Sequence, residues 1–263
     1  MKLTTHLPTT TPSALQSATT HPFLRLAGAG RIHKPLLSQW LSQDRLYAQS
    51  YVRFIGALLA KIQLPRTPSD PSKPSAHEKI LTVLVDAITN IQTELGFFES
   101  SAREFGLDLN APSTEAGDEG KGKTFGAAPI TQSYIDMFMS ASSPGTSLLE
   151  GLVVLWATEV CYLRAWRFAA SYREESTDAS GRPKQTDGSE DADGGALRIR
   201  FIPNWSSLEF EAFVDRIGKV LDEFAEEELK KLGEDATARC ERWWGQVVWL
   251  EERFWPNVGE YDS

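Results

Sequence analysis

The feature that most limits the possible folds of this chain is a helical spacing of apolar residues that recurs along most of its length. In several long segments, apolar side chains return every three or four positions, as they do on one face of an α-helix. The alternation of apolar and polar residues that marks a β-strand does not occur. Stretches rich in proline and glycine separate the segments. The segments that we expect to be helical are residues 21–30, 36–62, 76–105, 130–140, 147–172, 206–231 and 235–255.

The helical segments are predicted to form a single all-α domain over residues 21–255. A chain of 263 residues is long enough to bury a sizeable core. We expect a flexible leader at residues 1–20 and a tail at residues 256–263. Two stretches within the domain are low in apolar residues and rich in small polar ones, so they cannot bury enough surface to fold. Flexible insertions are therefore predicted near residues 110–128 and 174–197.

Composition excludes several classes of protein. The formal net charge is −9 and the pI is about 5.1, whereas proteins that bind nucleic acids or anionic membranes rely on clustered lysine and arginine. Two cysteines are too few for a disulfide framework and fit a reducing compartment. No apolar stretch reaches the ~20 residues of a membrane span, and the N-terminus has no apolar signal region. We therefore expect a cytoplasmic protein that binds neither nucleic acid nor membrane.

A carboxylate in the middle of the most apolar segment raises the first question about function. Residues 155–166 read LWATEVCYLRAW, which places Glu159 among apolar neighbours. Because positions three apart lie on one face of a helix, we expect Trp156, Glu159 and Tyr162 to form one strip. A buried carboxylate is costly unless another group pairs with it. We therefore expect that another part of the chain pairs with Glu159 or that the residue belongs to a functional site.

The same combination of a carboxylate and aromatic rings occurs on two other predicted helices. Asp44 has Tyr47 and Tyr51 at helical spacing, and Glu251 has Phe254. Three such faces brought together form a pocket with aromatic walls and acidic corners, which suits a flat, nitrogen-rich heterocycle. Two carboxyl groups of different pKa in that pocket can act as general acid and base. The ordinary alternative is that the rings belong to the core and the carboxylates face water or an arginine.

Five segments of the sequence resemble one known family. They are the opening HPFLRLAGAGRIHKPLLSQWLSQDRLYAQSYVRFIGALLAKI and then TELGFFESSAREFGL, PITQSYIDMF, NWSSLEFEAFVDRIGKVLDEF and WLEERFW. In order and spacing they resemble the TenA/THI-4 family over residues 21–255. The resemblance implies a haem-oxygenase-like bundle of helices. It also implies a pocket for the aminopyrimidine part of thiamin, which family members cleave from thiamin or salvage from its degraded forms.

The family pattern gives several of these residues an expected role. Asp44 falls on its pyrimidine-binding aspartate, and Glu251 falls on the glutamate proposed as a proton shuttle. Trp205 stands where many members have a tyrosine, so a hydroxyl contact to the substrate is expected to be missing. Spacing and resemblance together predict catalytic roles for Asp44, Glu159 and Glu251. They predict contacts to the substrate from Tyr47, Tyr51, Tyr134, Trp156, Tyr162, Trp205 and Phe254.

The helix that carries Glu159 resembles one branch of the family in particular. The thiaminase II branch has a proline and a nucleophilic cysteine on this helix, where this chain has Ala157 and Thr158. Thr158 cannot replace a thiolate without an adjacent base. The stretch instead resembles the cysteine-less, plant TenA_E-type branch, whose glutamate matches Glu159. Cys161 lies on another side of the helix, and we expect it to be buried and inert.

The resemblance therefore implies a C–N hydrolase that salvages the hydroxymethylpyrimidine part of degraded thiamin by removing an amino or N-formyl group. We expect acid/base catalysis by carboxylates, with no cofactor and no metal, since no cluster of His, Cys and carboxylates has the spacing of metal ligands. The expected partners are a small-molecule aminopyrimidine and further copies of the chain, in a dimer or tetramer. Two alternatives stay open. One is a non-catalytic member that binds a pyrimidine or a protein, and the other is a thiaminase II with a displaced cysteine.

Overall fold

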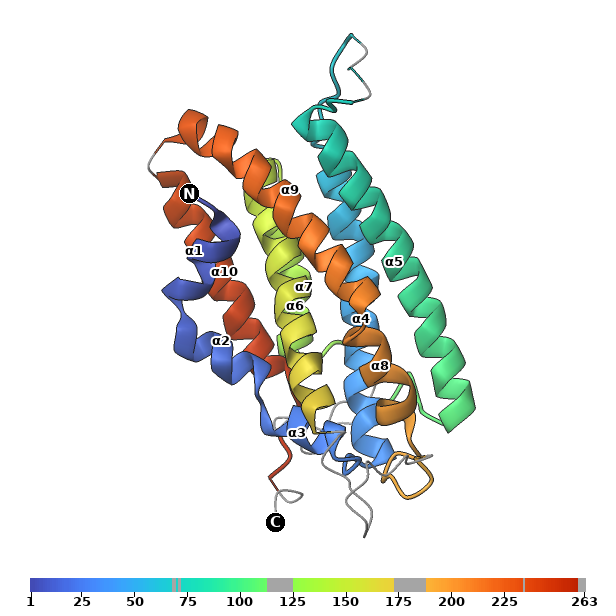
Figure 1. The fold of residues 1–263 in the computed structure, drawn as a ribbon. Helices are drawn as coiled ribbons and strands as arrows, with labels where there is room; N and C mark the ends of the chain where they lie inside the picture. Colours follow the sequence, from blue (N-terminus) through green and yellow to red (C-terminus); the bar gives the residue numbers. More distant parts are fainter. Residues whose placement is uncertain (68–69, 71, 113–124, 173–187, 234, 260–263) are drawn as a thin grey trace.

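The computed structural model describes residues 1–67, 70, 72–112, 125–172, 188–233 and 235–259. These residues form α-helices and one short π-helix, and no strand occurs among them (Figure 1). The prediction of an all-α fold is therefore confirmed. The elements are α1 (Leu3–Thr10), α2 (Pro12–Thr19), α3 (Pro22–Gly28), α4 (Lys34–Leu59), α5 (Ala76–Phe105), α6 (Pro129–Ala141), α7 (Leu148–Ser171), the π-helix η1 (Ala196–Phe201), α8 (Ile202–Trp205), α9 (Leu208–Leu232) and α10 (Asp235–Phe254).

Local signals in the sequence set where the long helices begin and end. Helix α5 begins at a capping box, in which the side chains of Ser75 and Glu78 each bond to the other's backbone N–H. It ends at Gly106, whose φ of 63° lies in the left-handed region that favours glycine. Ser147 and Glu150 form the same box at the start of α7. These caps satisfy backbone groups that the helix itself leaves unpaired.

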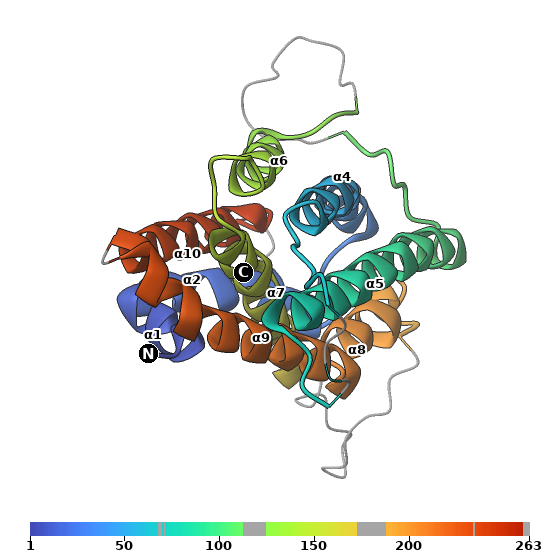
Figure 2. The ribbon, with the colours of Figure 1, turned by 90° about the horizontal axis from the view of Figure 1, so that it is seen from above.

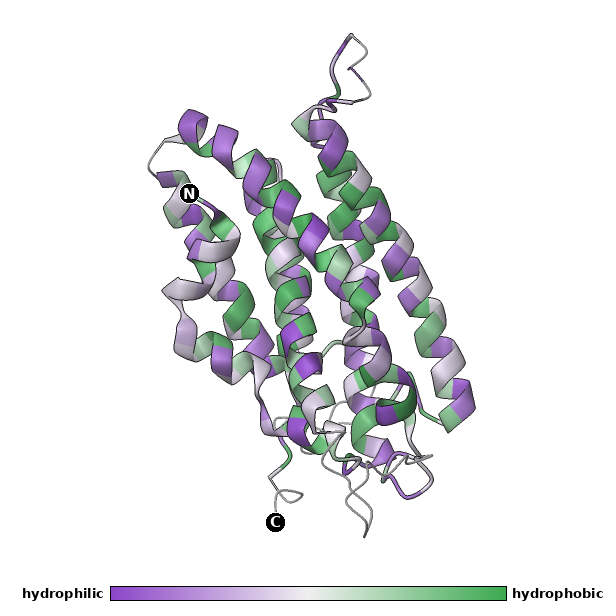
Figure 3. Ribbon diagram, in the orientation of Figure 1, coloured by the Kyte–Doolittle hydropathy of each residue, from purple (hydrophilic) through white to green (hydrophobic). Residues whose placement is uncertain are grey.

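Helix α7 is the central helix of the bundle. Buried apolar residues occur on all of its sides, which is typical of a helix enclosed by other helices. It packs against α10 and α9 and also against α2, α3 and α8, and the view from above shows α2, α8, α9 and α10 around it (Figure 2). The outer helices α5 and α9 carry hydrophilic residues along their length, as Figure 3 shows. Most side chains of α7 are therefore removed from bulk water, whereas Arg164 and Ser171 are exposed.

Buried apolar residues form two clusters that meet in the middle of the bundle. The first cluster includes Phe54 and Trp244, and the second includes Trp40 and Trp166 near α3 and α8. Phe254 packs against both clusters. The two clusters are therefore continuous through Phe254.

The N-terminal residues are folded, so the prediction of a flexible leader at residues 1–20 is wrong. Helices α1 and α2 pack against α9, α10 and α7. Leu3, Leu7 and Ala18 have no exposed surface, and Thr4 bonds through its N–H and its hydroxyl to Asp222 of α9. The prediction relied on the many Ser and Thr residues of this segment. Its leucines at positions 3 and 7 are spaced four apart, which is enough for a short helix to bury one face.

The predicted insertions are only partly covered by the described residues. Most of the 110–128 stretch, and residues 174–187, lie outside them. Residues 188–197 are folded, which corrects the second insertion at its C-terminal end: Asp193 has no exposed surface and accepts from the backbone N–H groups of Gly195 and Leu197. Polar composition suggested flexibility here, but the carboxylate replaces water as the partner of these N–H groups. In the predicted tail, Val258 is likewise buried.

Candidate functional site

A cavity of about 230 Å³ lies between α4, α5, α7, α8 and α9. The described residues that line it combine aromatic rings with carboxylates. Among its lining residues, Asn90, Thr93, Asn204 and Glu209 are exposed, so the cavity opens to solvent where α5 meets α8 and α9. Its inner wall includes Asp44, Tyr47 and Tyr51 from α4 and Thr158, Glu159 and Tyr162 from α7.

Two carboxylates of the inner wall are held by tyrosines from the facing helix. Tyr51 Oη of α4 donates to Glu159 Oε1 of α7 at 2.6 Å. Tyr162 Oη of α7 donates to Asp44 Oδ2 of α4 at 3.0 Å. The pairs cross in opposite directions, so each helix contributes one acid and one donor. This reciprocal arrangement answers the question raised by Glu159, because its partner is a neutral hydroxyl.

Glu251 lies one layer behind the cavity wall. Its Oε1 accepts from Tyr134 Oη at 2.6 Å, and both side chains are buried. The Tyr134 ring meets the edge of Tyr47 with centroids 5.1 Å apart, and Phe254 packs against the same tyrosines. Tyr47 lines the cavity, whereas Glu251, Tyr134 and Phe254 do not. These three predicted site residues therefore support the wall from behind.

Glu94 of α5 is a carboxylate of the cavity that the sequence analysis missed. Its Oε1 accepts from Trp205 Nε1 at 2.5 Å, so Trp205 does line the cavity but directs its N–H at Glu94. The signal was present in the sequence. Glu94 interrupts the apolar stripe of its helix three residues after Ile91 and four before Phe98, as Glu159 interrupts the apolar face of α7.

Burial raises the pKa of each of these acids. It is the largest cause for Asp44, whose pKa lies well above its ordinary value, with the nearby charge of Glu94 acting in the same direction. Burial raises the pKa of Glu94 and of Glu159 to about 7. It raises that of Glu251 to about 8, although the bond from Tyr134 acts against it. Carboxyl groups that titrate near neutral pH can give or take a proton there.

The charges around the cavity are of one sign. Asp44, Glu94, Glu159 and Glu209 line it, and no Lys, Arg or His does so in the described part of the chain. The described residues also contain no group of three His, Cys, Asp or Glu side chains placed to hold a metal ion. Acidic groups without basic partners favour a ligand that is a cation or that presents several N–H donors.

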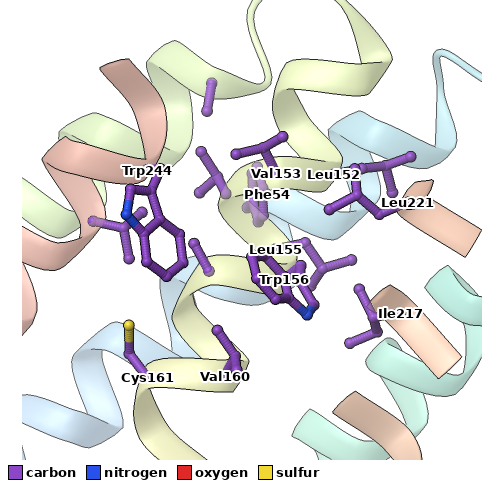
Figure 4. Packing of buried hydrophobic residues seen from close by; sticks show 14 of the residues in the cluster. Phe54, Leu152, Val153, Leu155, Trp156, Val160, Cys161, Ile217, Leu221 and Trp244 are labelled. Carbon is purple, nitrogen blue, oxygen red and sulfur yellow. The ribbon is translucent and has the colours of Figure 1, made fainter. Parts of the chain in front are cut away.

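Trp156 is the fourth predicted site residue that does not line the cavity, and it does not support the wall either. Trp156 does not line the cavity but stacks on Trp244 of α10, with centroids 5.5 Å apart (Figure 4). The prediction that Trp156, Glu159 and Tyr162 form one strip is wrong. Trp156 and Tyr162 are six residues apart, and at about 100° per residue their side chains point about 120° apart around the helix. Thr158 takes the place on the cavity wall that Trp156 was expected to hold.

Neither cysteine lies at the cavity. Cys161 has no exposed surface, and burial raises the pKa of its thiol well above the ordinary value. Cys240 is also fully buried, and its pKa is raised to about 12, mainly by burial. Figure 4 shows Cys161 among apolar side chains. Neither residue therefore provides a thiolate at the cavity, which argues against the alternative of a displaced nucleophile.

Comparison with known proteins identifies relatives of the whole bundle. A family model described as TENA/THI-4/PQQC matches residues 10–260. A TenA homologue from Pyrococcus furiosus has a similar structure, with a TM-score of 0.70 and 25% identity over 96% of this chain and 97% of that one. A TenA family protein from Silicibacter has a TM-score of 0.68 and 16% identity over 97% of this chain and 95% of that one. The expected haem-oxygenase-like fold of the TenA proteins is thus confirmed.

Two curated sequences are also similar. A Fusarium pseudograminearum protein named "Probable transcription factor" is 33% identical over 97% of this chain and 52% of its own length. A Glycine max protein named "Probable bifunctional TENA-E protein" is 21% identical over 55% of this chain and 54% of its own length. The chain thus spans about half the length of these two relatives. None of the described helices is both long enough and apolar enough to cross a membrane. The family match over nearly the whole chain shows that it belongs to the TENA/THI-4/PQQC family.

Proposed function

We propose that the protein is a hydrolase of the TenA_E type that cleaves a C–N bond of an aminopyrimidine derived from thiamin. The observation that carries the proposal is a single aromatic cavity in which carboxylates of α4, α5 and α7 meet without a basic residue among its described lining. Family membership and the name of the Glycine max relative support the same class of substrate. The substrate would be the aminomethyl or formylaminomethyl form of the pyrimidine.

Asp44 is the group that we propose to hold the pyrimidine ring. Its Oδ2 accepts from Tyr162, and its Oδ1 has no hydrogen bond to any described residue. Because Asp44 lines the cavity, this oxygen is available for the amino group or a ring N–H of the ligand. The rings of Tyr47 and Tyr51 from one side and of Trp205 and Phe210 from another can stack on the heterocycle.

Glu159 is the group that we propose to move protons. With a pKa of about 7 it is half ionised at neutral pH. As carboxylate it takes a proton from water, whose oxygen then bonds to the carbon next to the leaving nitrogen. As acid it returns that proton to the nitrogen when the C–N bond breaks, so the products are an alcohol and ammonia, or an amine and formate. Tyr51 fixes the carboxylate for both steps.

Glu251 is proposed to act through the wall. The negative charge of Glu159 raises the pKa of Glu251, and the same repulsion between like charges acts in reverse on Glu159. Loss of Glu251 should therefore change the pH at which Glu159 works, with a smaller loss of rate than a direct proton donor would show.

The test is release of ammonia from the aminomethyl compound and of formate from the formylaminomethyl compound. Glu159→Gln should lower kcat by about 100-fold or more, and Glu251→Gln should lower it less and shift the pH profile. Glu99→Gln, an exposed site on α5 outside the cavity, is the control. If the wild type binds the hydroxymethyl product but turns over neither substrate, the protein is a binding module and the hydrolase proposal fails. Loss of thiamin that an alkylating agent blocks would indicate a thiaminase.

We also propose that the protein works in the cytoplasm as a homo-oligomer. Met139 of α6 and Trp249 of α10 are 49% and 48% exposed, and the two helices are in contact. Apolar side chains on neighbouring helices suit an interface with a second copy. Light scattering coupled to size exclusion should give a mass of at least two chains. Trp249→Glu should lower it, and a wild type that elutes as a monomer would contradict the proposal.

A further inference from the structure

Glu94 is a carboxylate of the cavity to which neither the helical strips nor the family resemblance gave a role. Its Oε1 accepts from Trp205 Nε1 at 2.5 Å, and its Oε2 accepts from Asn204 Nδ2 at 3.2 Å. Each carboxylate oxygen can accept two hydrogen bonds, so both keep capacity for a ligand. Both donors are neutral, and no basic residue lines the cavity in the described chain. The protein therefore fixes this carboxylate without compensating its charge.

Glu94 and Asp44 lie at different depths. Asp44 is 3% exposed, at the inner end of the cavity. Glu94 is half-buried, and its neighbours Thr93 and Asn204 are exposed at the opening. A heterocycle held at Asp44 therefore has Glu94 on its way out, where a substituent of the ring would lie.

We propose that Glu94 determines specificity by pairing with the ammonium group of an aminomethyl-substituted pyrimidine, so that the cavity prefers this cation to the neutral formylaminomethyl and hydroxymethyl compounds. The inference rests on the proposed function, since it takes the ring to be held at Asp44. An alkylamine is protonated at neutral pH, as the lysine side chain is, whereas a formamide or a hydroxyl is neutral. Hydrogen bonds between ionised groups are about twice as strong as neutral ones. At a half-buried carboxylate, where water screens the charge only in part, that difference separates ligands of similar shape.

Calorimetric titration at neutral pH with the three pyrimidines tests the proposal on the wild type, Glu94→Gln and Glu99→Gln. Glu99 lies exposed on the same helix and outside the cavity, and its substitution removes the same charge. We expect Glu94→Gln to weaken binding of the aminomethyl compound by about tenfold or more, because it removes a bond between charged groups. The two neutral ligands should change less than about threefold, and Glu99→Gln should change none of the three.

A second variant, Trp205→Phe, keeps the carboxylate but removes the N–H that holds it, and it should lower the preference for the amine. Thermal unfolding shows whether each variant is folded. An unchanged affinity for the amine in Glu94→Gln overturns the role of Glu94, and so does an equal loss for all three ligands. A wild type that binds none of the pyrimidines refutes the proposed function itself. Binding of all three with no effect of Glu94 refutes only the inference.

Discussion

Replacing Glu251 with glutamine should stabilise the protein at alkaline pH. Glu251 is 4% exposed, and burial raises its pKa from 4.5 to about 8, with the charge of Glu159 acting in the same direction and the bond from Tyr134 against it. A carboxyl whose pKa is higher in the folded than in the unfolded state keeps a proton that the unfolded chain releases. Its contribution to the free energy of unfolding is therefore greatest below pH 4.5 and is lost as the pH rises toward 8.

The size of the effect follows from the same values. One pKa unit corresponds to about 1.4 kcal/mol, so a shift from 4.5 to about 8 corresponds to a loss of up to roughly 5 kcal/mol in free energy of unfolding across this range. Glutamine has the shape of the protonated acid, stays neutral, and offers a carbonyl oxygen to Tyr134. We expect the variant to match the wild type near the lower end of the range and to exceed it by a few kcal/mol above pH 8.

Urea unfolding followed by circular dichroism, repeated between about pH 5 and pH 9, measures this difference. Glu99→Gln serves as the control, because it makes the same substitution at an exposed position outside the cavity. A wild type whose free energy of unfolding stays constant over the range would refute the reasoning. So would a Glu251→Gln curve that runs parallel to that of the wild type.

Three further predictions follow from the same contacts. Tyr51→Phe removes the hydroxyl that stabilises ionised Glu159, so the acidic limb of the pH–rate profile should move up by about one pH unit. The control is Tyr172→Phe, which changes a ring outside the cavity and should leave the limb in place. A limb that stays in place or moves down in Tyr51→Phe contradicts the assignment. A phosphorylated hydroxymethylpyrimidine should bind at least about tenfold more weakly than the unphosphorylated compound in calorimetry, because the described lining offers no cation to the phosphate. Equal affinity of the two compounds would show that a cation of the protein reaches the phosphate. Leu7→Ala should lower the free energy of unfolding by about 2–5 kcal/mol, since Leu7 is fully buried, and a loss below about 1 kcal/mol would show that the N-terminal helices contribute little.

The helices could be predicted from the sequence because their periodicity is a local property. Residues 76–105 were assigned correctly to the residue, since a serine cap and a glycine mark the two ends. The prediction of a flexible leader was wrong because the leucines at positions 3 and 7 stand among polar residues. Only the faces of α9 and α10 against which they pack show that these leucines belong to the core. Composition cannot reveal a partner surface supplied by distant residues.

The candidate site was predictable only in part, for a geometric reason. Spacing places residues on one face of a helix, but it does not say which other helix that face meets. Asp44, Glu159 and Tyr162 were expected together and lie on one cavity. Trp156 was expected on the same face because each step of three residues moves only about 60° around the helix, although two such steps add up to about 120°. Glu94 was not predicted because the apolar stripe of α5 indicates a core helix and does not by itself mark a polar residue within it as functional.

The hydrogen-bond donors that hold the carboxylates affect which ligands the cavity can bind. An arginine beside Asp44 or Glu159 would hold the acid equally well, but it would lower the pKa and use the negative charge within the protein. Tyrosine and tryptophan donors fix the geometry and leave the charge uncompensated, and the pKa values are raised as a result, to about 7 for Glu94 and Glu159. The balance between protonated and ionised acid can then be decided by the ligand. A cation entering the cavity favours the ionised form of the carboxylate that it meets, whereas a neutral ligand leaves a larger share of the acid protonated and able to donate. The same set of acids can thus bind a ligand by charge through one carboxylate and transfer a proton through another.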